Sequence, residues 1–357
     1  MKNLSTFAWS FIFIGSMTVF SCRSNIEMYD LRSASKMRNY LSDTSNKVRT
    51  GGVRIIPIST PKGNFKVWTK TVGHNEQIKV LLLGSGPGLS HEYLQCIESY
   101  FPEKAISFIY YDPLGSGSSD NPNDTTLWNL ARYTDEIEQV RSALNLNQDN
   151  FYLFGHGWGG VLAMEYALKH QNNLKALILS NIVSSSKVYN SYARQLTSNR
   201  LPVQTTGKVD QKEAKPNNGN SKDQAQLTEF NSKHVCRIPP DQLQGPVKSF
   251  FNIQNDSINI FLGGPGSVQI SRQLANWDRS ADLARITVPT LTVGAKYDFM
   301  DPQHIKWMAS QIQNGTFLYC ANGSHLSMYD DQQAYMTGIT DFIYKVYRKE
   351  HWEDIYF

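Results

Sequence analysis

Cysteine is scarce in this sequence, and its spacing excludes two common ways of stabilising a fold. The 357 residues contain four cysteines, and no two of them have C-x-x-C spacing. Neither a structural zinc site nor a disulfide framework is therefore indicated. At most one disulfide can form among Cys96, Cys236 and Cys320, and we interpret these three as small, mostly buried apolar side chains.

Long runs of one charge sign are also missing. The chain has 35 basic and 31 acidic residues and a formal net charge of +4. Surfaces that bind nucleic acid concentrate positive charge, so we expect no nucleic-acid partner. With 40% hydrophobic and 12% aromatic residues, the chain can instead bury the core of one α/β domain with an inserted lid.

The apolar stretch near the start of the chain is too short to cross a bilayer comfortably. Residues 7–20 follow Lys2 and have the length of the h-region of a secretory signal. The next residues complete V-F-S-C, which resembles a bacterial lipobox and predicts that Cys22 is lipidated and attaches an exported protein to the cell envelope. The alternative is a soluble periplasmic or secreted protein with an incidental cysteine.

The pattern of apolar residues predicts a mostly parallel sheet. Alternating or β-branched runs bounded by Gly and Pro indicate an opening antiparallel hairpin. Later apolar runs lack this alternation, which is typical of strands buried on both faces. Segments with helical spacing of apolar residues lie between several of these runs. We therefore expect an α/β fold with helices on both faces of the sheet. The hairpin is predicted at 53–57 and 65–71, the buried strands at 79–83, 106–111, 151–154, 176–180 and 290–293, and the clearest helices at 135–145 and 158–169.

Composition divides the chain into segments. After a signal segment, a polar stretch without apolar periodicity forms a tether. A long segment then interrupts the strand–helix rhythm, and we interpret it as an inserted lid whose polar piece, 207–226, is its most mobile part. The predicted segments are the signal 1–22, tether 23–50, first core part 51–183, lid 184–276, second core part 277–350 and C-terminal tail 351–357.

Residues 151–160 have the anatomy of a nucleophile elbow. An apolar strand leads into G-H-G-W-G-G, and a helical pattern follows. In the G-x-S-x-G form of this turn, the outer glycines let the helix approach the sheet, and the central serine is exposed at the top. Gly155 and Gly159 occupy the outer positions, but the central position is Gly157.

Three further segments complete the pattern of an α/β-hydrolase. Residues 81–88, L-L-L-G-S-G-P-G, follow a buried strand where such enzymes place the loop that supplies an oxyanion donor. Asp298 ends a later strand, and His325 ends a loop beyond it. The chain order of elbow, acid and base is that of the α/β-hydrolases.

These motifs resemble the proline iminopeptidase family over roughly residues 55 to 347. Residues 81–88 resemble its L-L-L-H-G-G-P-G, residues 151–160 its L-x-G-H-S-W-G-G, and residues 110–117, Y-Y-D-P-L-G-S-G, its Y-Y-D-Q-L-G-S-G. H-V-C-R at 234–237, Trp277, Asp278 and Pro302 also match. The resemblance implies an α/β-hydrolase core with a mostly helical cap, no metal or organic cofactor, and release of an N-terminal residue, typically proline, from short peptides.

Carried over by position, the resemblance assigns the machinery. Asp298 would orient the base His325, and the backbone N–H groups of Trp158 and Gly86 would form the oxyanion hole. The nucleophile would lie at Gly157, where no side chain exists.

Other departures concern the first glycine-rich loop and the substrate's amino terminus. Gly84 replaces the family's histidine, and Ser85 replaces its next glycine. Ser267 stands where a glutamate helps to bind the substrate amine, and Phe299 stands where some members have another glutamate.

Two hypotheses follow from the missing nucleophile. In the first, the chain is a pseudoenzyme that binds a short peptide or small molecule without hydrolysing it. In the second, it is an active hydrolase in which His325 activates a water beside Gly157 or Ser85 acts as a substitute nucleophile. For His325 to activate it, the Ser85 hydroxyl must lie close to an imidazole nitrogen of His325.

Overall fold

A computed structural model describes residues 52–197, 221–251, 255–263, 269–351 and 354–356. The chain divides into two units, 1–49 and 50–357, and every described residue belongs to the second. The signal segment with Cys22, the tether, most of the polar piece of the lid, and Ser267 therefore lie outside the described residues. No helix in the described ranges is long and apolar enough to cross a membrane.

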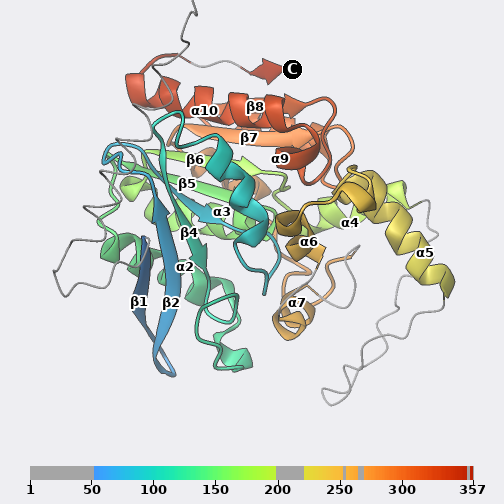
Figure 1. Ribbon diagram of the computed structural model, residues 1–357, viewed down its shortest axis with the longest axis horizontal. Helices are drawn as coiled ribbons and strands as arrows, with labels where there is room; N and C mark the ends of the chain where they lie inside the picture. Colours follow the sequence, from blue (N-terminus) through green and yellow to red (C-terminus); the bar gives the residue numbers. More distant parts are fainter. Residues whose placement is uncertain (1–51, 198–220, 252–254, 264–268, 352–353, 357) are drawn as a thin grey trace, which may run out of the picture. The chain divides into compact units, whose positions relative to one another are not determined.

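Nine strands of the described chain form a single sheet in the order β1-β2-β4-β3-β5-β6-β7-β8-β9 (Figure 1). The pairs β1–β2 and β2–β4 are antiparallel, and all other neighbours are parallel. The strands are β1 (Val53–Thr60), β2 (Gly63–Val72), β3 (Lys79–Leu83), β4 (Ser107–Asp112), β5 (Phe151–His156), β6 (Ala176–Ser180), β7 (Thr290–Ala295), β8 (Gly315–Cys320) and β9 (Ile355–Tyr356).

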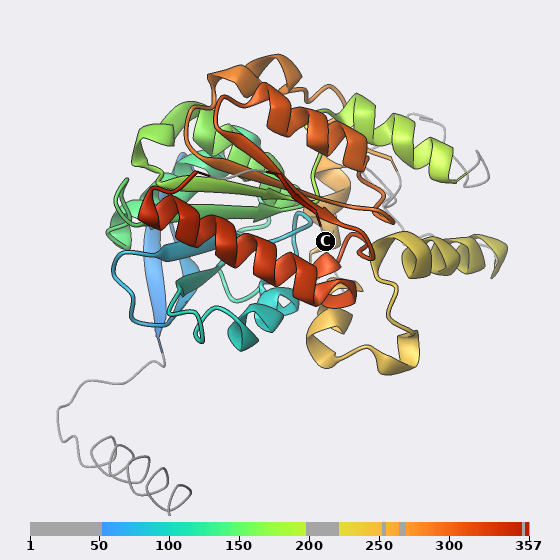
Figure 2. The same cartoon turned by 90° about the horizontal axis from the view of Figure 1, so that it is seen from above.

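The burial of the strands explains their sequence patterns. Every residue of β5 and β6 is buried, because helices cover both faces of the parallel part of the sheet. Figure 2 shows α10 (Gln332–Arg348) on one face and α3 (Trp158–His170) and α8 (Pro302–Gln311) on the other. In the edge strand β1, by contrast, Ile56 and Ile58 are buried and the residues beside them are exposed.

The remaining helices complete the core and the segment between β6 and β7. In the core these are α2 (Leu130–Ala143) and α9 (Ser327–Asp330), with 3₁₀ helices η1 (Glu92–Ser99), η2 (Thr125–Leu127), η3 (Gln171–Asn173) and η6 (Ser280–Arg285). Between β6 and β7 lie α4 (Ser186–Leu196), α5 (Ser221–Phe230), π-helix η4 (Asn231–Val235), 3₁₀ helix η5 (Pro240–Gln242), α6 (Gly245–Phe251) and α7 (Asp256–Leu262).

The fold predicted from the sequence is confirmed, with differences at its margins. Helix α2 begins at Leu130 rather than at residue 135, because the Asn129 side chain caps it by accepting a hydrogen bond from the Arg132 N–H at 2.9 Å. The segment predicted as a tail contains β9, and residues 221–226, assigned to the polar mobile piece, begin α5.

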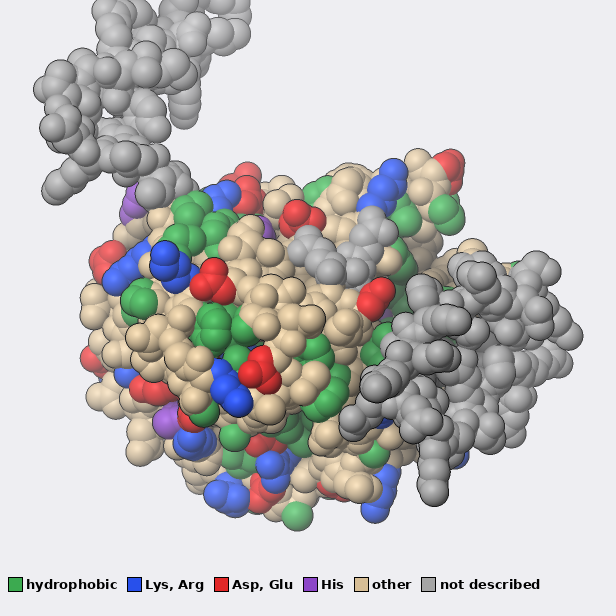
Figure 3. All heavy atoms as spheres, turned by 90° about the horizontal axis from the view of Figure 1, so that it is seen from below, with side chains coloured by type: hydrophobic (Ala, Val, Ile, Leu, Met, Phe, Trp, Pro, Cys, Tyr) green, Lys and Arg blue, Asp and Glu red, His purple; other side chains and the backbone are tan. Residues whose placement is uncertain are grey.

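The described chain has free cysteines and, on the face in Figure 3, a surface of mixed charge. Cys96, Cys236 and Cys320 are free thiols, the first half-buried and the other two buried. On the face drawn in Figure 3, basic and acidic side chains are interspersed among the described residues.

Candidate active site

The elbow is a tight turn between β5 and α3. Gly157 has φ 54° and ψ −119°, in the left-handed half of backbone space that L-residues adopt only under strain. A Cβ on Gly155 would lie 2.3 Å from the Gly159 carbonyl oxygen, and one on Gly159 would lie 2.1 Å from the Leu83 carbonyl oxygen. The flanking positions therefore accept only glycine, which brings α3 close to the sheet.

The predicted acid and base lie together, fully buried. His325 Nδ1 is 3.0 Å from Asp298 Oδ1. The carboxylate also accepts from the Asn181 side-chain amide at 2.8 Å and from the Met300 N–H at 3.0 Å. With Nδ1 directed at the acid, Nε2 of His325 is the nitrogen left to accept a proton.

Ser85 occupies the volume that a nucleophile on the elbow would fill. A Cβ on Gly157 would lie 2.3 Å from Ser85 Oγ, 3.1 Å from Ser85 Cβ and 3.3 Å from His325 Nε2. The Ser85 hydroxyl thus lies near the base, but among the described residues no hydrogen bond joins it to His325 Nε2. The space beside the missing side chain contains a hydroxyl from the neighbouring loop.

The two residues predicted to supply the oxyanion donors lie at one small cavity. Gly86 and Trp158 line the same small cavity at the carboxyl ends of β3 and β5. Within the described chain, no protein group accepts a hydrogen bond from either N–H. Trp158 is also the first residue of α3, where the helix dipole favours negative charge.

Aromatic side chains and the segment after β6 enclose the base. The Phe299 ring is 4.3 Å from the His325 ring, and the Phe250 ring of α6 is 6.0 Å from it. The His325 N–H donates to the His234 carbonyl at 3.0 Å, so the matched segment 234–237 supports the loop of the base. Phe299, predicted near the substrate amine, thus presents an apolar face to the site, where a glutamate would present a charge.

The described residues include no group of three or more His, Cys, Asp or Glu side chains that could hold a metal ion. Two residues of the site were not predicted from the sequence. Asn181 follows β6 and has φ 53°. Tyr93 has a hydroxyl that accepts from the Ser85 N–H at 2.5 Å. A turn-forming residue directly after a buried strand was the signal available for Asn181.

Comparisons with known proteins show which proteins this chain is similar to. A family model described as alpha/beta hydrolase fold matches residues 79–332. A proline iminopeptidase of Chitinophaga pinensis is 51% identical over 293 residues, which cover 82% of this chain and 98% of the relative. One of Flavobacterium johnsoniae is 44% identical over 292 residues, covering 81% and 97%. The solved proline iminopeptidase of Mycobacterium smegmatis shares the fold with a TM-score of 0.71 at 22% identity, covering 83% of this chain and 99% of that one.

Proposed function

The chain belongs to the proline iminopeptidase family of alpha/beta hydrolases, and from this premise we propose that it is an active peptidase that releases an N-terminal proline from short peptides, with Ser85 as its nucleophile. The observation that supports this proposal is the 2.3 Å between Ser85 Oγ and the Cβ that a residue 157 would have. In this proposal the attacking hydroxyl comes from the loop after β3 and not from the elbow.

The residues present would support acyl transfer through Ser85. His325 Nε2 takes the Ser85 hydroxyl proton as Oγ attacks the carbonyl carbon of the N-terminal residue. The N–H groups of Trp158 and Gly86 bind the oxyanion that forms. The imidazolium then gives its proton to the leaving amine, and a water, deprotonated by His325, hydrolyses the acyl-enzyme and restores the hydroxyl.

The other hypotheses have less support. The pseudoenzyme hypothesis depends on an empty nucleophile position, whereas Ser85 Oγ lies 2.3 Å from the Cβ that a residue 157 would have. A water activated by His325 would need the same volume, since Ser85 Oγ and Cβ both lie within 3.1 Å of the point beside Gly157.

Turnover of a fluorogenic proline amide tests the proposal. We expect the wild-type chain to release proline, and Ser85→Ala to lower kcat/KM by at least about 10³-fold, because the attacking atom is removed. Ser186→Ala is the control, since it removes another buried serine hydroxyl, one without a protein partner.

Two different results would contradict the proposal, and each would support one of the other hypotheses. A folded wild-type chain that releases no proline would support the pseudoenzyme hypothesis. A Ser85→Ala variant that retains turnover, together with an inactive His325→Ala variant, would support the activated water.

A further inference from the structure

Three buried hydrogen bonds connect the backbone of the base to the backbone of Ser85. His156 Nε2 lies 2.9 Å from the His325 carbonyl oxygen, and His156 Nδ1 lies 3.0 Å from the Tyr93 hydroxyl. The same hydroxyl accepts from the Ser85 N–H at 2.5 Å. The side chains of Tyr93 and His156 are both fully buried, so water does not compete for these bonds.

The chemistry of the groups fixes the direction of every bond. The His325 carbonyl can only accept, so His156 Nε2 donates. A neutral imidazole then has a bare Nδ1, which must accept from the Tyr93 hydroxyl. The phenol oxygen is left to accept from the Ser85 N–H. Burial lowers the pKa of His156 well below its usual value, which keeps the ring in this neutral form.

We infer that Tyr93 and His156 are positioning residues that hold Ser85 in the place of the nucleophile. This inference rests on the proposed function. Ser85 lies between Gly84 and Gly86, which have no side chains with which to hold the loop in place. The Tyr93 hydroxyl supplies the restraint at the N–H of Ser85 itself.

The position of Tyr93 is in turn fixed by packing. Its carbonyl accepts from the Tyr329 hydroxyl at 2.7 Å, and its ring meets the Phe250 ring edge-on at 5.3 Å. A Cβ on Gly84 would lie 3.5 Å from the Tyr93 ring, so a longer side chain at that position would be directed at the ring. Glycine at 84 therefore leaves room for the tyrosine that anchors the next residue.

This series of hydrogen bonds ends at the proposed nucleophile, Ser85, and at the base, His325. Displacing a catalytic group by about 1 Å can lower turnover about 10²-fold even when binding is unchanged. Because the Ser85 N–H is engaged by Tyr93, it is not an oxyanion donor, and that role stays with Gly86 and Trp158. Tyr93 and His156 thus act through Ser85 and His325 and need not touch the substrate.

The test uses Tyr93→Phe, which removes only the hydroxyl. We expect kcat on the proline amide to fall about 10- to 100-fold, with KM changed less than about 2-fold. The rate at which a fluorophosphonate labels Ser85, followed by peptide mass, should fall by a similar factor. Tyr166→Phe is the matched control, because it removes a buried tyrosine hydroxyl that donates to Glu138 at 2.7 Å. It should lose some thermal stability and keep kcat per labelled molecule.

Two variants of His156 separate positioning from packing. His156→Gln keeps one donor and one acceptor and should retain most of the wild-type kcat, whereas His156→Leu keeps neither and should behave like Tyr93→Phe. If Tyr93→Phe and His156→Leu keep kcat per labelled site while Ser85→Ala is inactive, the inference is wrong and the proposed function stands. If the folded full-length wild type neither turns over the amide nor is labelled at Ser85, the proposed function fails and the inference fails with it.

Discussion

At the scale of single residues, our proposal divides between Gly157 and Ser85 what one serine provides in a conventional elbow. Gly157 has the strained turn, with φ 54°, and Ser85 would supply the hydroxyl. Attack on a carbonyl depends on where the hydroxyl oxygen lies relative to the base and the oxyanion donors. It does not depend on which loop carries the serine. The absence of a side chain at 157 is then a requirement, because any Cβ there would occupy the space of the hydroxyl.

The variant Gly157→Ala tests that requirement. Its methyl group would lie 2.3 Å from Ser85 Oγ, so the hydroxyl must leave its present place. We expect kcat/KM on a proline amide to fall at least about 10²-fold, although no polar group is removed. Unchanged turnover of Gly157→Ala would contradict the requirement for glycine at this position.

Gly63→Ala is the control for this experiment. Gly63 also has a positive φ, of 118°, and a Cβ there meets nothing within 4 Å, so this variant adds backbone strain without steric contact and should keep wild-type kcat. The double variant Ser85→Gly/Gly157→Ser removes the steric conflict, and a fluorophosphonate should then label residue 157.

The residues of the site were predictable to different degrees. Asp298 and His325 follow from chain order, because strand ends of a parallel sheet meet at one edge. Ser85 could be proposed as a substitute, but its closeness to Gly157 depends on the register of β3 beside β5, which aligns Leu83 with Gly155. Tyr93 lies in a 3₁₀ helix, and no local pattern in the sequence links it to His156.

At the scale of elements, the buried strands were the most predictable part. β3 and β6 have the predicted bounds, because apolar runs between glycines and polar turns have few alternatives. β9 has two residues and depends on its pairing with β8, so it has almost no signal of its own. Residues 221–226 are polar, which favoured mobility, but lysine, glutamine and alanine are good helix formers and α5 begins there.

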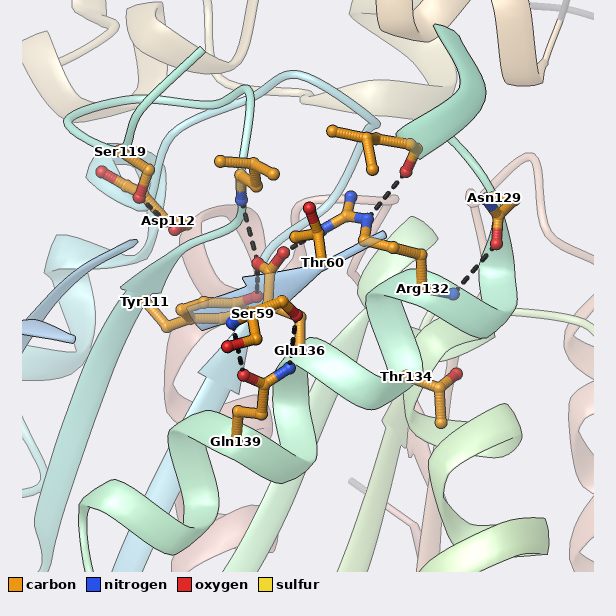
Figure 4. Close-up of polar contacts among 12 residues, drawn as sticks. Ser59, Thr60, Tyr111, Asp112, Ser119, Asn129, Arg132, Thr134, Glu136 and Gln139 are labelled. Carbon is orange, nitrogen blue, oxygen red and sulfur yellow. Dashed lines mark hydrogen bonds and ion pairs between the residues drawn. The ribbon is translucent and has the colours of Figure 1, made fainter. Parts of the chain in front are cut away.

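The buried Glu136 carboxylate pairs with Arg132 on the same helix and joins α2 to the end of β4 and to the loop beyond it (Figure 4). The Glu136 carboxylate accepts from the Arg132 guanidinium, from the Tyr111 hydroxyl and from the Leu114 N–H, the last at 2.9 Å. The Arg132 guanidinium also donates to the Leu127 carbonyl at 2.7 Å and lies over the Tyr133 ring. Pro113 of this loop and Tyr133 line the cavity of the oxyanion donors.

Glu136→Ala should therefore be strongly destabilising. It leaves the charge of Arg132 buried without its partner, and we expect the free energy of unfolding to fall by about 3 to 5 kcal/mol. Asp135→Asn, one residue earlier on α2, breaks an exposed ion pair with Lys169 and should cost less than about 1 kcal/mol. Urea unfolding followed by circular dichroism measures both. Equal effects of the two changes would contradict a special role for the buried pair.

At the scale of the whole molecule, the described α/β-hydrolase fold belongs to the second unit of the chain. Its relatives align over about four fifths of the sequence, and the family model begins at residue 79. The predictions of export and attachment concern the first fifty residues, which lie outside the described structure. We propose, from the lipobox-like residues 19–22 alone, that Cys22 is acylated and holds the peptidase at the cell envelope.

Fractionation of a bacterium that produces the full chain tests this proposal. Acyl chains contribute about 0.8 kcal/mol for each buried CH₂, so two or more chains give stable attachment. We expect the wild type in the membrane fraction, with an acylated cysteine at the mature N-terminus by mass spectrometry. Cys22→Ala should move the protein to the soluble fraction, whereas Cys96→Ala, which removes a half-buried cysteine of the core, should not. An unmodified Cys22 in a soluble wild-type protein would instead support a periplasmic or secreted enzyme that meets its peptides by diffusion.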